Sequence, residues 1–302
     1  MTAEVTVHVD GHKLALSNLD KELYPEVGLT KAGVIDYYRR VASVLLPHLV
    51  NRTLTMFRCP DGVGKPGFFD KNAARHAPSW LRTCAISASP GGGEDPPGYA
   101  LINDLAGLVW VANLAGVELH VPQWTIGPRG GRRLPDLLVF DLDPGAPATI
   151  VQCCAVALRL RERLAADGLT SYAKTSGSKG MQLYAPVQVS APERTSAYAH
   201  TIANELAVQC PDAVISRMTR SLRPGKVFID WSQNNPAKTT VAPYSLRARP
   251  CATVSTPVTW EEVAACRVPD ELSFTYQDVL TRIADSGDLM EPLLLQGPRL
   301  PR

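Results

Sequence analysis

The chain has 302 residues, of which 45% are hydrophobic and 20% are charged. This composition is typical of a globular protein with a buried core, and it excludes a disordered, collagen-like or coiled-coil chain. The formal net charge of +2 neither requires nor excludes a nucleic-acid partner. No apolar run approaches the ~20 residues of a membrane-spanning helix, and the N-terminus lacks the apolar core of a signal peptide. We therefore expect a cytoplasmic protein with no membrane partner.

Three helices are predicted from apolar residues that recur at spacings of three and four. The first begins at Thr30, its predicted N-cap, and ends near Pro47. The second covers about Ala148–Asp167 and the third about Pro192–Gln209. Between the first two lies Ser87–Gly98, a stretch rich in Gly and Pro that is typical of a mobile surface loop.

Four strands are predicted from short apolar runs bounded by Gly or Pro. They are Leu137–Leu142, Gly168–Lys174, Met181–Pro186 and Val227–Trp231. The tight turn SGSKG, residues 176–180, favours a hairpin, so we expect a mixed fold with substantial antiparallel pairing rather than a doubly wound parallel sheet. The final LLLQGPRLPR, residues 293–302, is predicted to be a tail.

Carboxylates at the ends of two predicted strands are candidate metal ligands. Asp141 and Asp143 lie one residue apart, so both side chains point to the same face of the sheet, within ~7 Å of each other. Such a pair repels unless a cation lies between the two groups, although it is equally well explained as caps of the following helix. A second strand ends in Asp230, which by itself is more often a surface residue. Together the three form a ligand set for two divalent cations, Mg²⁺ or Mn²⁺.

Other segments carry groups suited to phosphates and bases. Backbone N–H groups of the SGSKG turn can surround an anion, and Lys179 adds a positive charge, but similar hairpin turns often bind nothing. His120 has apolar neighbours and is more often a structural histidine than a ligand. The adjacent Phe68 and Phe69 are either core residues or an exposed stacking pair. A basic series that follows the third helix suits phosphate contacts, and the alternative is a positively charged face exposed to solvent. Its members are Arg220, Arg223, Lys226, Lys238, Arg247 and Arg249.

Five segments in order, ELHVPQW, DLDPG, SGSKG, KVFIDWSQN and KTTVAPYSLR, resemble the polymerase domain of bacterial DNA ligase D. The similarity runs from Leu16 to near Leu289. It implies the α+β fold of the archaeo-eukaryotic primase superfamily, in which an RRM-like antiparallel sheet and flanking helices surround a catalytic cleft. We expect a single domain over residues 1–302, with an N-terminal part of roughly 1–115 and a catalytic part of roughly 116–290, present as a stand-alone protein.

The resemblance also implies roles for individual residues. It places two divalent metals, Mn²⁺ or Mg²⁺, on the catalytic aspartates Asp141, Asp143 and Asp230. It places the nucleotide on five side chains, which are His120, Ser176, Lys179, Arg223 and Arg247. It places DNA on five others, which are Lys21, Lys31, Phe68, Phe69 and Lys71.

Two departures from the family pattern concern phosphate contacts. Where relatives usually have a Lys-Arg pair, this chain has Phe57 and Arg58, which removes a lysine from the expected grip on the 5′ phosphate of a break. Where relatives commonly have histidine after the SGSKG motif, this chain has Gln182, which forms hydrogen bonds but cannot become cationic.

The resemblance therefore implies a DNA-dependent nucleotidyltransferase of non-homologous end joining. It is expected to add NTPs or dNTPs, with ribonucleotides preferred, to primer ends at short gaps or breaks, beside a Ku-like end-binding protein and a separate DNA ligase. Two alternatives remain. The three carboxylates could position water in a two-metal nuclease or phosphodiesterase, or the fold could serve as a non-catalytic DNA-end-binding module.

Overall fold

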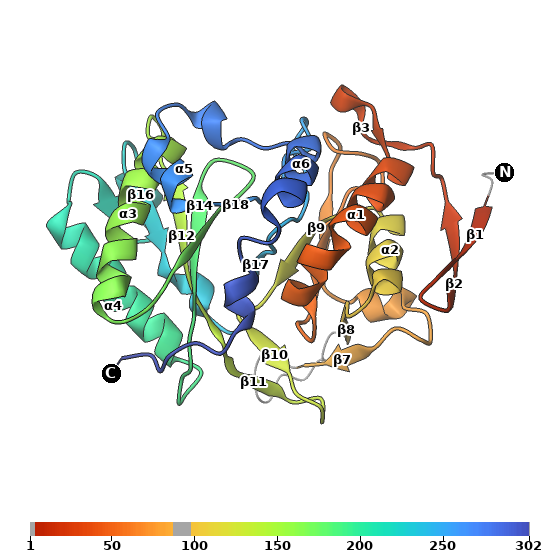
Figure 1. Cartoon of the computed structure of the whole chain (residues 1–302), viewed down its shortest axis with the longest axis horizontal. Coiled ribbons are helices and arrows are strands. Elements are labelled where there is room, and N and C mark those ends of the chain that lie inside the picture. Colours follow the sequence, from red (N-terminus) through yellow and green to blue (C-terminus); the bar gives the residue numbers. More distant parts are fainter. Residues whose placement is uncertain (1–3, 87–97, 302) are drawn as a thin grey trace.

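The structure is a computed structural model that describes residues 4–86 and 98–301. Two lobes lie side by side, and each consists of a mainly antiparallel sheet with helices on one face (Figure 1). This confirms the predicted α+β fold with antiparallel pairing. The predicted Ser87–Gly98 loop lies outside the described residues apart from Gly98. Among the residues described, no helix has the length and apolar character needed to cross a membrane.

The first lobe contains a four-stranded sheet in the order β17-β9-β5-β6. Its strands are β5 (Thr55–Arg58), β6 (Phe68–Asp70), β9 (Gly116–Val121) and β17 (Thr240–Val241). Helices α1 (Lys31–Leu49) and α2 (Leu105–Asn113) cover one face. The side chain of Thr30 accepts a hydrogen bond from the Gly33 N–H, which confirms the predicted start of the first helix. The helix continues two residues beyond Pro47 before it ends at Leu49.

The second lobe contains a six-stranded sheet in the order β15-β16-β12-β14-β13-β18. Its strands are β12 (Leu137–Pro144), β13 (Tyr172–Thr175), β14 (Met181–Pro186), β15 (Val214–Ile215), β16 (Val227–Asp230) and β18 (Pro257–Val258). Helices α3 (Ile150–Ala166) and α4 (Arg194–Gln209) pack on one face of this sheet. Strands β13 and β14 form the predicted hairpin, and β15 with β16 is a parallel pair. The strand predicted from Gly168 begins later, at Tyr172, because Gly168 adopts a positive φ just after α3.

Strand β12 divides the second lobe into a core side and a cavity side. Leu138, Phe140 and Leu142 point to the helices and are at most 1% exposed. The alternating residues point to the opposite face, which at the C-terminal end of the strand carries Asp141 and Asp143. The apolar side therefore fixes the register of the strand, and the register fixes where the carboxylates lie.

Shorter elements connect and cover the two sheets. Small two-stranded sheets are formed by β1 (Glu4–Val9) with β2 (His12–Ser17), β3 (Glu22–Tyr24) with β4 (Leu29–Thr30), β7 (Thr83–Ala85) with β8 (Gly98–Ala100), and β10 (Trp124–Ile126) with β11 (Arg132–Pro135). Helices α5 (Trp260–Ala265) and α6 (Tyr276–Ser286) follow late in the chain. The short 3₁₀ helices η4 (Trp231–Asn234) and η6 (Glu291–Leu294) follow β16 and α6.

The core of the first lobe is not continuous in sequence. Residues up to Val121 pack with a late segment that includes Ala242, Tyr244, Val254 and Val279. Strand β17 completes the first sheet by pairing with β9, and α6 lies against α1 (Figure 1). The division into parts of roughly 1–115 and 116–290 stays a prediction, but residues on both sides of it build one core.

The expectation of a C-terminal tail is wrong, because the last residues pack against the second lobe. Leu293 belongs to a small apolar cluster with Leu137 and Tyr184. The Gln188 side chain donates to the Gly297 carbonyl at 2.6 Å, and the Leu300 N–H donates to the Gln188 carbonyl at 2.9 Å. Leu293 is therefore a packing residue, although Leu294 and Leu295 are exposed.

Candidate active site

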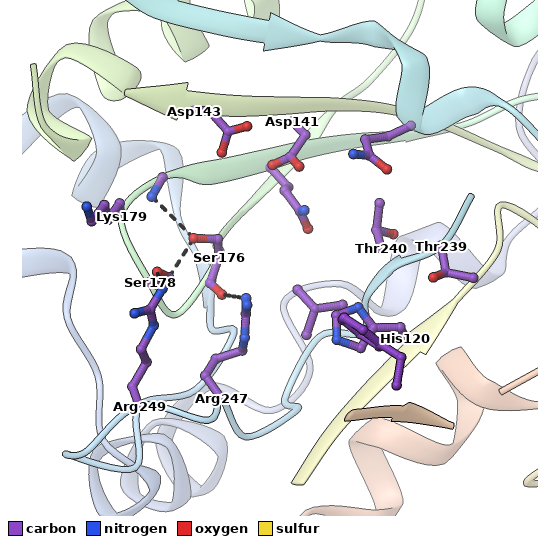
Figure 2. A pocket seen from close by; sticks show the side chains of 15 residues that line it. His120, Asp141, Asp143, Ser176, Ser178, Lys179, Thr239, Thr240, Arg247 and Arg249 are labelled. Carbon is purple, nitrogen blue, oxygen red and sulfur yellow. Dashed lines mark hydrogen bonds between the residues drawn. The ribbon is translucent and has the colours of Figure 1, made fainter. Parts of the chain in front are cut away.

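A cavity of about 500 Å³ lies between the two sheets. The first sheet contributes Phe69 from β6, His120 from β9 and Thr240 from β17. The second contributes Asp141 and Asp143 from β12, together with the β13–β14 turn. Figure 2 shows the two carboxylates on one wall, with His120, Arg247 and Arg249 on the facing wall. Seven of the residues predicted from the sequence line this cavity: Phe69, His120, Asp141, Asp143, Ser176, Lys179 and Arg247.

The carboxylates are held close together by strand pairing. Asp141 of β12 lies directly opposite Asp230 of β16, so their side chains share a face. Burial, and the charge of the neighbouring Asp143, raise the pKa of Asp141 well above its ordinary value. Burial, and the charge of Asp230, also raise the pKa of Asp143. Such mutual repulsion marks a place where a cation would be favourable.

Asp230 has a different environment from the other two aspartates. Its Oδ1 accepts a hydrogen bond from the Ser232 N–H at 3.0 Å, and its Oδ2 accepts one from Gln233 Nε2 at 2.8 Å. It thereby caps η4, and its residue is 9% exposed. Lys238 Nζ lies 3.9 Å from Oδ2. Asp230 thus neighbours Asp141 on the sheet but does not line the cavity in this structure.

The β13–β14 turn borders the cavity and is held together by hydrogen bonds within the turn. Ser176 Oγ accepts hydrogen bonds from the N–H groups of Ser178 and Gly180, both at 3.2 Å. A Cβ atom at Gly180 would lie 2.0 Å from the Leu142 carbonyl oxygen, so glycine is required for this close approach. Arg249 Nη2 donates to Ser178 Oγ at 2.6 Å. The turn is therefore held rigidly against the end of β12.

Arg247 and His120 are both held by one buried carboxylate, Glu118. Its Oε2 accepts a hydrogen bond from His120 Nε2 at 2.8 Å, and its Oε1 accepts one from the Ala248 N–H at 2.8 Å. Arg247 Nε lies 3.1 Å from Oε1. Burial alone raises the pKa of Glu118, but the hydrogen bond from His120 and the charge of Arg247 lower it to about 2. Glu118 is thus ionised at neutral pH.

His120 contributes a neutral imidazole to the cavity wall. Burial lowers its pKa below the ordinary value for histidine, although Glu118 opposes this effect. Because Nε2 bonds to Glu118, the neutral ring carries its proton on Nε2 and leaves Nδ1 as an acceptor. The ring also packs edge-on against Phe69, with 5.3 Å between centroids. Phe69 in turn packs against Phe57 at 4.9 Å, so the unexpected Phe57 supports an aromatic row beside the cavity.

Comparison with known proteins identifies the family. The profile described as "LigD, primase-polymerase domain" matches residues 30–290. The chain belongs to this family. As a LigD primase-polymerase domain it is an enzyme of the polymerase class, and its relatives are proteins of DNA repair by non-homologous end joining.

Several relatives extend well beyond this domain. The chain is 44% identical over 287 residues to the "Multifunctional non-homologous end joining protein LigD" of Mycolicibacterium smegmatis, covering 95% of this chain and 37% of that protein. It is 33% identical to the "Bifunctional non-homologous end joining protein LigD" of Bacillus subtilis, covering 91% of this chain and 43% of that protein. The chain therefore spans about two fifths of the length of these relatives.

A solved structure is similar over almost the whole domain. It is the "Polymerase Domain from Mycobacterium tuberculosis Ligase D in complex with DNA". The TM-score is 0.87 at 43% identity, and the match covers 94% of this chain and 99% of that one. The two-lobed arrangement around the cavity is thus the fold of a LigD polymerase domain.

The residues predicted to bind DNA occupy several environments in this LigD domain. Phe68 and Phe69 are 47% and 58% exposed, as stacking residues need to be. Lys71 is exposed, and Lys21 Nζ forms an exposed ion pair with Asp61 at 2.9 Å. Lys31 is 5% exposed and donates from Nζ to the Ser17 carbonyl at 2.6 Å, so its ammonium group supports the fold around the start of α1.

Arg223 lies outside the cavity lining, near Asp143. Its guanidinium lies over the ring of Phe228, with Cζ 3.7 Å from the centroid, and Phe228 is the cross-strand partner of Asp143. Its charge lowers the pKa of Asp143 and so partly offsets the effect of burial. In this structure Arg223 therefore lies on the same face of the sheet as Asp143 and partly offsets its negative charge.

Two of the three candidate aspartates fit the divalent metal that this family implies. Within residues 4–86 and 98–301, no group of three or more His, Cys, Asp or Glu side chains is arranged to hold a metal ion. Asp141 and Asp143 offer carboxylate oxygens, which suit Mg²⁺ or Mn²⁺, and burial together with the neighbouring carboxylates raises the pKa of both. The chemistry of this pair fits a hard divalent cation, whereas Asp230 would have to give up bonds within η4 to join it.

Several cavity residues were not predicted from the sequence. They are Gln233, Thr239, Thr240 and Val241 at the rim, with Glu118 behind the wall. Gln233 and the two threonines lie within segments that carry the family resemblance, so those motifs could have indicated them. Glu118 could have been found from its place in ELH, two residues before His120 on the same face of a strand.

Proposed function

We propose that this chain adds nucleotides, with ribonucleotides preferred, to the 3′ end of a primer at short gaps or breaks in DNA, with two divalent cations, Mn²⁺ or Mg²⁺. The observation that carries this proposal is the opposition of carboxylates and cations across one cavity. Asp141 and Asp143 face Arg247 and Arg249, and the turn that carries Lys179 borders the same cavity (Figure 2). Relatives of the domain are named as end-joining proteins, which supports action at DNA breaks.

The cationic wall is suited to the triphosphate. Arginine forms paired hydrogen bonds with phosphate oxygens, and lysine adds a point charge. The Gly-containing turn holds Ser176 and Lys179 at the cavity without bulky side chains that would block an incoming phosphate. A nuclease acting on a phosphodiester has less need of so many cations, and we therefore favour nucleotidyl transfer.

The metal-binding role is proposed for Asp141, Asp143 and Asp230. Divalent cations on these carboxylates would activate the primer 3′ hydroxyl and stabilise the leaving pyrophosphate. Asp141 and Asp143 already face the cavity, and Asp230 is the cross-strand neighbour of Asp141. A divalent cation binds the ionised form of a carboxylate. Binding at Asp141 and Asp143 would therefore displace the protons that their raised pKa values favour.

The sugar preference is proposed to involve His120. The acceptor atom Nδ1 belongs to a side chain that lines the cavity, and a ribose offers a 2′ hydroxyl proton that deoxyribose lacks. Phe68 and Phe69, exposed beside the cavity, are proposed to stack on DNA bases. We propose that the positive charges of Lys21, Lys31 and Lys71 attract the phosphates of the DNA backbone. A Ku-like end-binding protein and a separate DNA ligase would complete the repair.

The proposal is tested by extension of a labelled primer across a short gap. Each rNTP and dNTP is supplied separately with Mn²⁺ or Mg²⁺, for the unaltered protein and for the double variant Asp141→Ala, Asp143→Ala. We expect metal-dependent addition, faster with rNTPs, that the double variant loses while its DNA affinity is retained. A shortened primer would instead indicate a nuclease, and gap binding without addition would indicate an end-binding module.

A further inference from the structure

A row of polar side chains crosses the second sheet beneath the cavity. Lys174 of β13 lies opposite Gln182 of β14, Gln182 lies opposite Asp141 of β12, and Asp141 lies opposite Asp230 of β16. Residues directly opposite each other on antiparallel strands have side chains on the same face, about 5 Å apart. A lysine, an amide and two carboxylates therefore form one continuous line that ends at the candidate metal ligands.

Lys174 is a cationic side chain that is completely buried. It is 0% exposed, and its Nζ lies 2.6 Å from Gln182 Oε1 and 2.6 Å from Ser255 Oγ. The ring of Tyr184 lies 5.6 Å from Nζ. Burial, with the charge of Arg247, lowers the pKa of Lys174 well below its ordinary value, although the charge of Asp141 acts in the opposite direction.

The hydrogen bonds around Lys174 fix which end of the Gln182 amide faces it. Ser255 Oγ donates its own proton to the Thr175 carbonyl at 2.9 Å, so it accepts from Lys174. The second N–H of the amine is then donated to Gln182, and the receiving atom must be the carbonyl oxygen Oε1. Two N–H donors are present whether the amine is protonated or neutral, so this orientation does not depend on the charge of Lys174.

The other end of the same amide serves Asp141. Lys174 and the Tyr184 hydroxyl, at 3.1 Å, both donate to Oε1, so the Nε2 donor of Gln182 is left for the Asp141 carboxylate opposite it on β12. If the amide turned over, Oε1 would face the carboxylate, and two acceptors would oppose each other. The orientation of Gln182 therefore decides whether its contact with Asp141 is attractive or repulsive.

We propose that Lys174 is a positioning residue for the metal site: it locks the Gln182 amide so that Nε2 donates to Asp141 and holds that carboxylate oriented for a divalent cation. This rests on the proposed function, since it gives Asp141 the role of a metal ligand. It also gives a physical account of Gln182, because a fixed amide, supported by a buried lysine, supplies a hydrogen-bond donor to the carboxylate.

The test is the affinity for Mn²⁺ alone, measured by titration with detection of free Mn²⁺ by electron paramagnetic resonance. Lys174→Met keeps the length of the side chain and removes its donors. Partners that orient a metal ligand typically change metal affinity by about 10–100-fold when they are removed. We expect a loss in that range for Lys174→Met, and unchanged affinity for the control Lys65→Met, which alters an exposed lysine.

A double-variant comparison separates positioning from a general effect on the fold. Gln182→Met should weaken Mn²⁺ binding similarly, and adding Lys174→Met to it should change the affinity by no more than about twofold, since the relay is already broken. Removing one partner of a buried hydrogen-bonded group lowers stability, so the affinity of Lys174→Met is compared well below its melting temperature. Additive losses in the double variant would overturn the proposal.

The outcomes also separate this inference from the proposed function. Failure of the unaltered protein to bind Mn²⁺ would overturn both. Binding by the unaltered protein, with Lys174→Met or Gln182→Met within about twofold of it, would overturn the role of the relay alone. Should Lys174→Met not fold, unchanged affinity in Gln182→Met would still overturn the proposal, because the relay acts through the Nε2 donor that this variant removes.

Discussion

Replacing Glu118 by Gln tests whether one carboxylate holds the cationic wall together. Glu118 has a 9% exposed side chain and contacts His120, Arg247 and the N–H of Ala248. Glutamine keeps the shape and one acceptor but removes the charge. Arg247 then lies beside a neutral group in a buried place, and His120 loses a charged partner. We expect loss of both stability and nucleotide affinity.

The magnitude follows from the pKa of Glu118, which falls from 4.5 in its ordinary state to about 2 in the folded protein. At about 1.4 kcal/mol per pKa unit, this corresponds to about 3 kcal/mol of folding free energy at pH 7. Because the folded pKa is depressed, the contribution is fully present above pH 4.5 and is lost as the pH falls toward 2. At pH 3, about 1 kcal/mol should remain.

The assay is urea unfolding of the unaltered protein and of Glu118→Gln at pH 7 and at lower pH. The difference in unfolding free energy should be about 3 kcal/mol at pH 7 and should shrink in acid, because glutamine does not titrate. Glu26→Gln, at an exposed position, is the matched control and should show little difference at any pH. A difference for Glu118→Gln that is below about 1 kcal/mol at pH 7, or that does not vary with pH, would refute the reasoning.

Three further variants test the turn and the C-terminal packing. Lys179→Ala should raise KM for the nucleotide about tenfold and leave DNA affinity unchanged, because one charged phosphate contact is lost; equal losses in both titrations would contradict this role. Gly180→Ala should lower the unfolding free energy by about 1–3 kcal/mol, because its Cβ would lie 2.0 Å from the Leu142 carbonyl oxygen. The assay is urea unfolding, and an unchanged midpoint would show that the turn can move to accept a side chain. Asp288→Asn should destabilise the protein by about 2 kcal/mol at pH 7, because the buried carboxylate accepts a hydrogen bond from His48 at 2.8 Å. Burial raises the pKa of Asp288, but the hydrogen bond from His48 and the other polar contacts together lower it below its ordinary value, so the carboxylate stabilises the folded protein less as the pH falls. Thermal melts should therefore show a smaller destabilisation by Asp288→Asn in acid, and a larger one would contradict this direction.

Local patterns predicted the elements that carry the chemistry. The strand leading to Asp141 and Asp143 was predicted from a short apolar run and the hairpin around the SGSKG turn from turn chemistry, and both are present. These features are encoded over a few consecutive residues, where side-chain alternation and the needs of a tight turn decide the structure. The family resemblance then indicated which of these side chains lie together.

Long-range contacts explain what the sequence did not predict. The relay from Lys174 depends on the registers of three strands and on Ser255, which is 81 residues away in the chain. The packing of Leu293 depends on strands that end more than a hundred residues earlier. The engagement of Asp230 with η4 depends on how the chain turns after β16. None of these partners follows from the local composition of the segment that contains it.

The discontinuous core of the first lobe has a consequence for synthesis on the ribosome. Residues up to Val121 emerge early, yet Tyr244, Val254 and Val279, which complete their apolar core, are made much later. At about 5–20 residues per second, the wait is on the order of ten seconds. During that time the early helices expose apolar surface that chaperones can bind. The main core of the second lobe runs from Leu138 to Leu272, but Leu293, which packs on its other face, is made after α6. Both lobes therefore depend on the last part of the chain to finish folding.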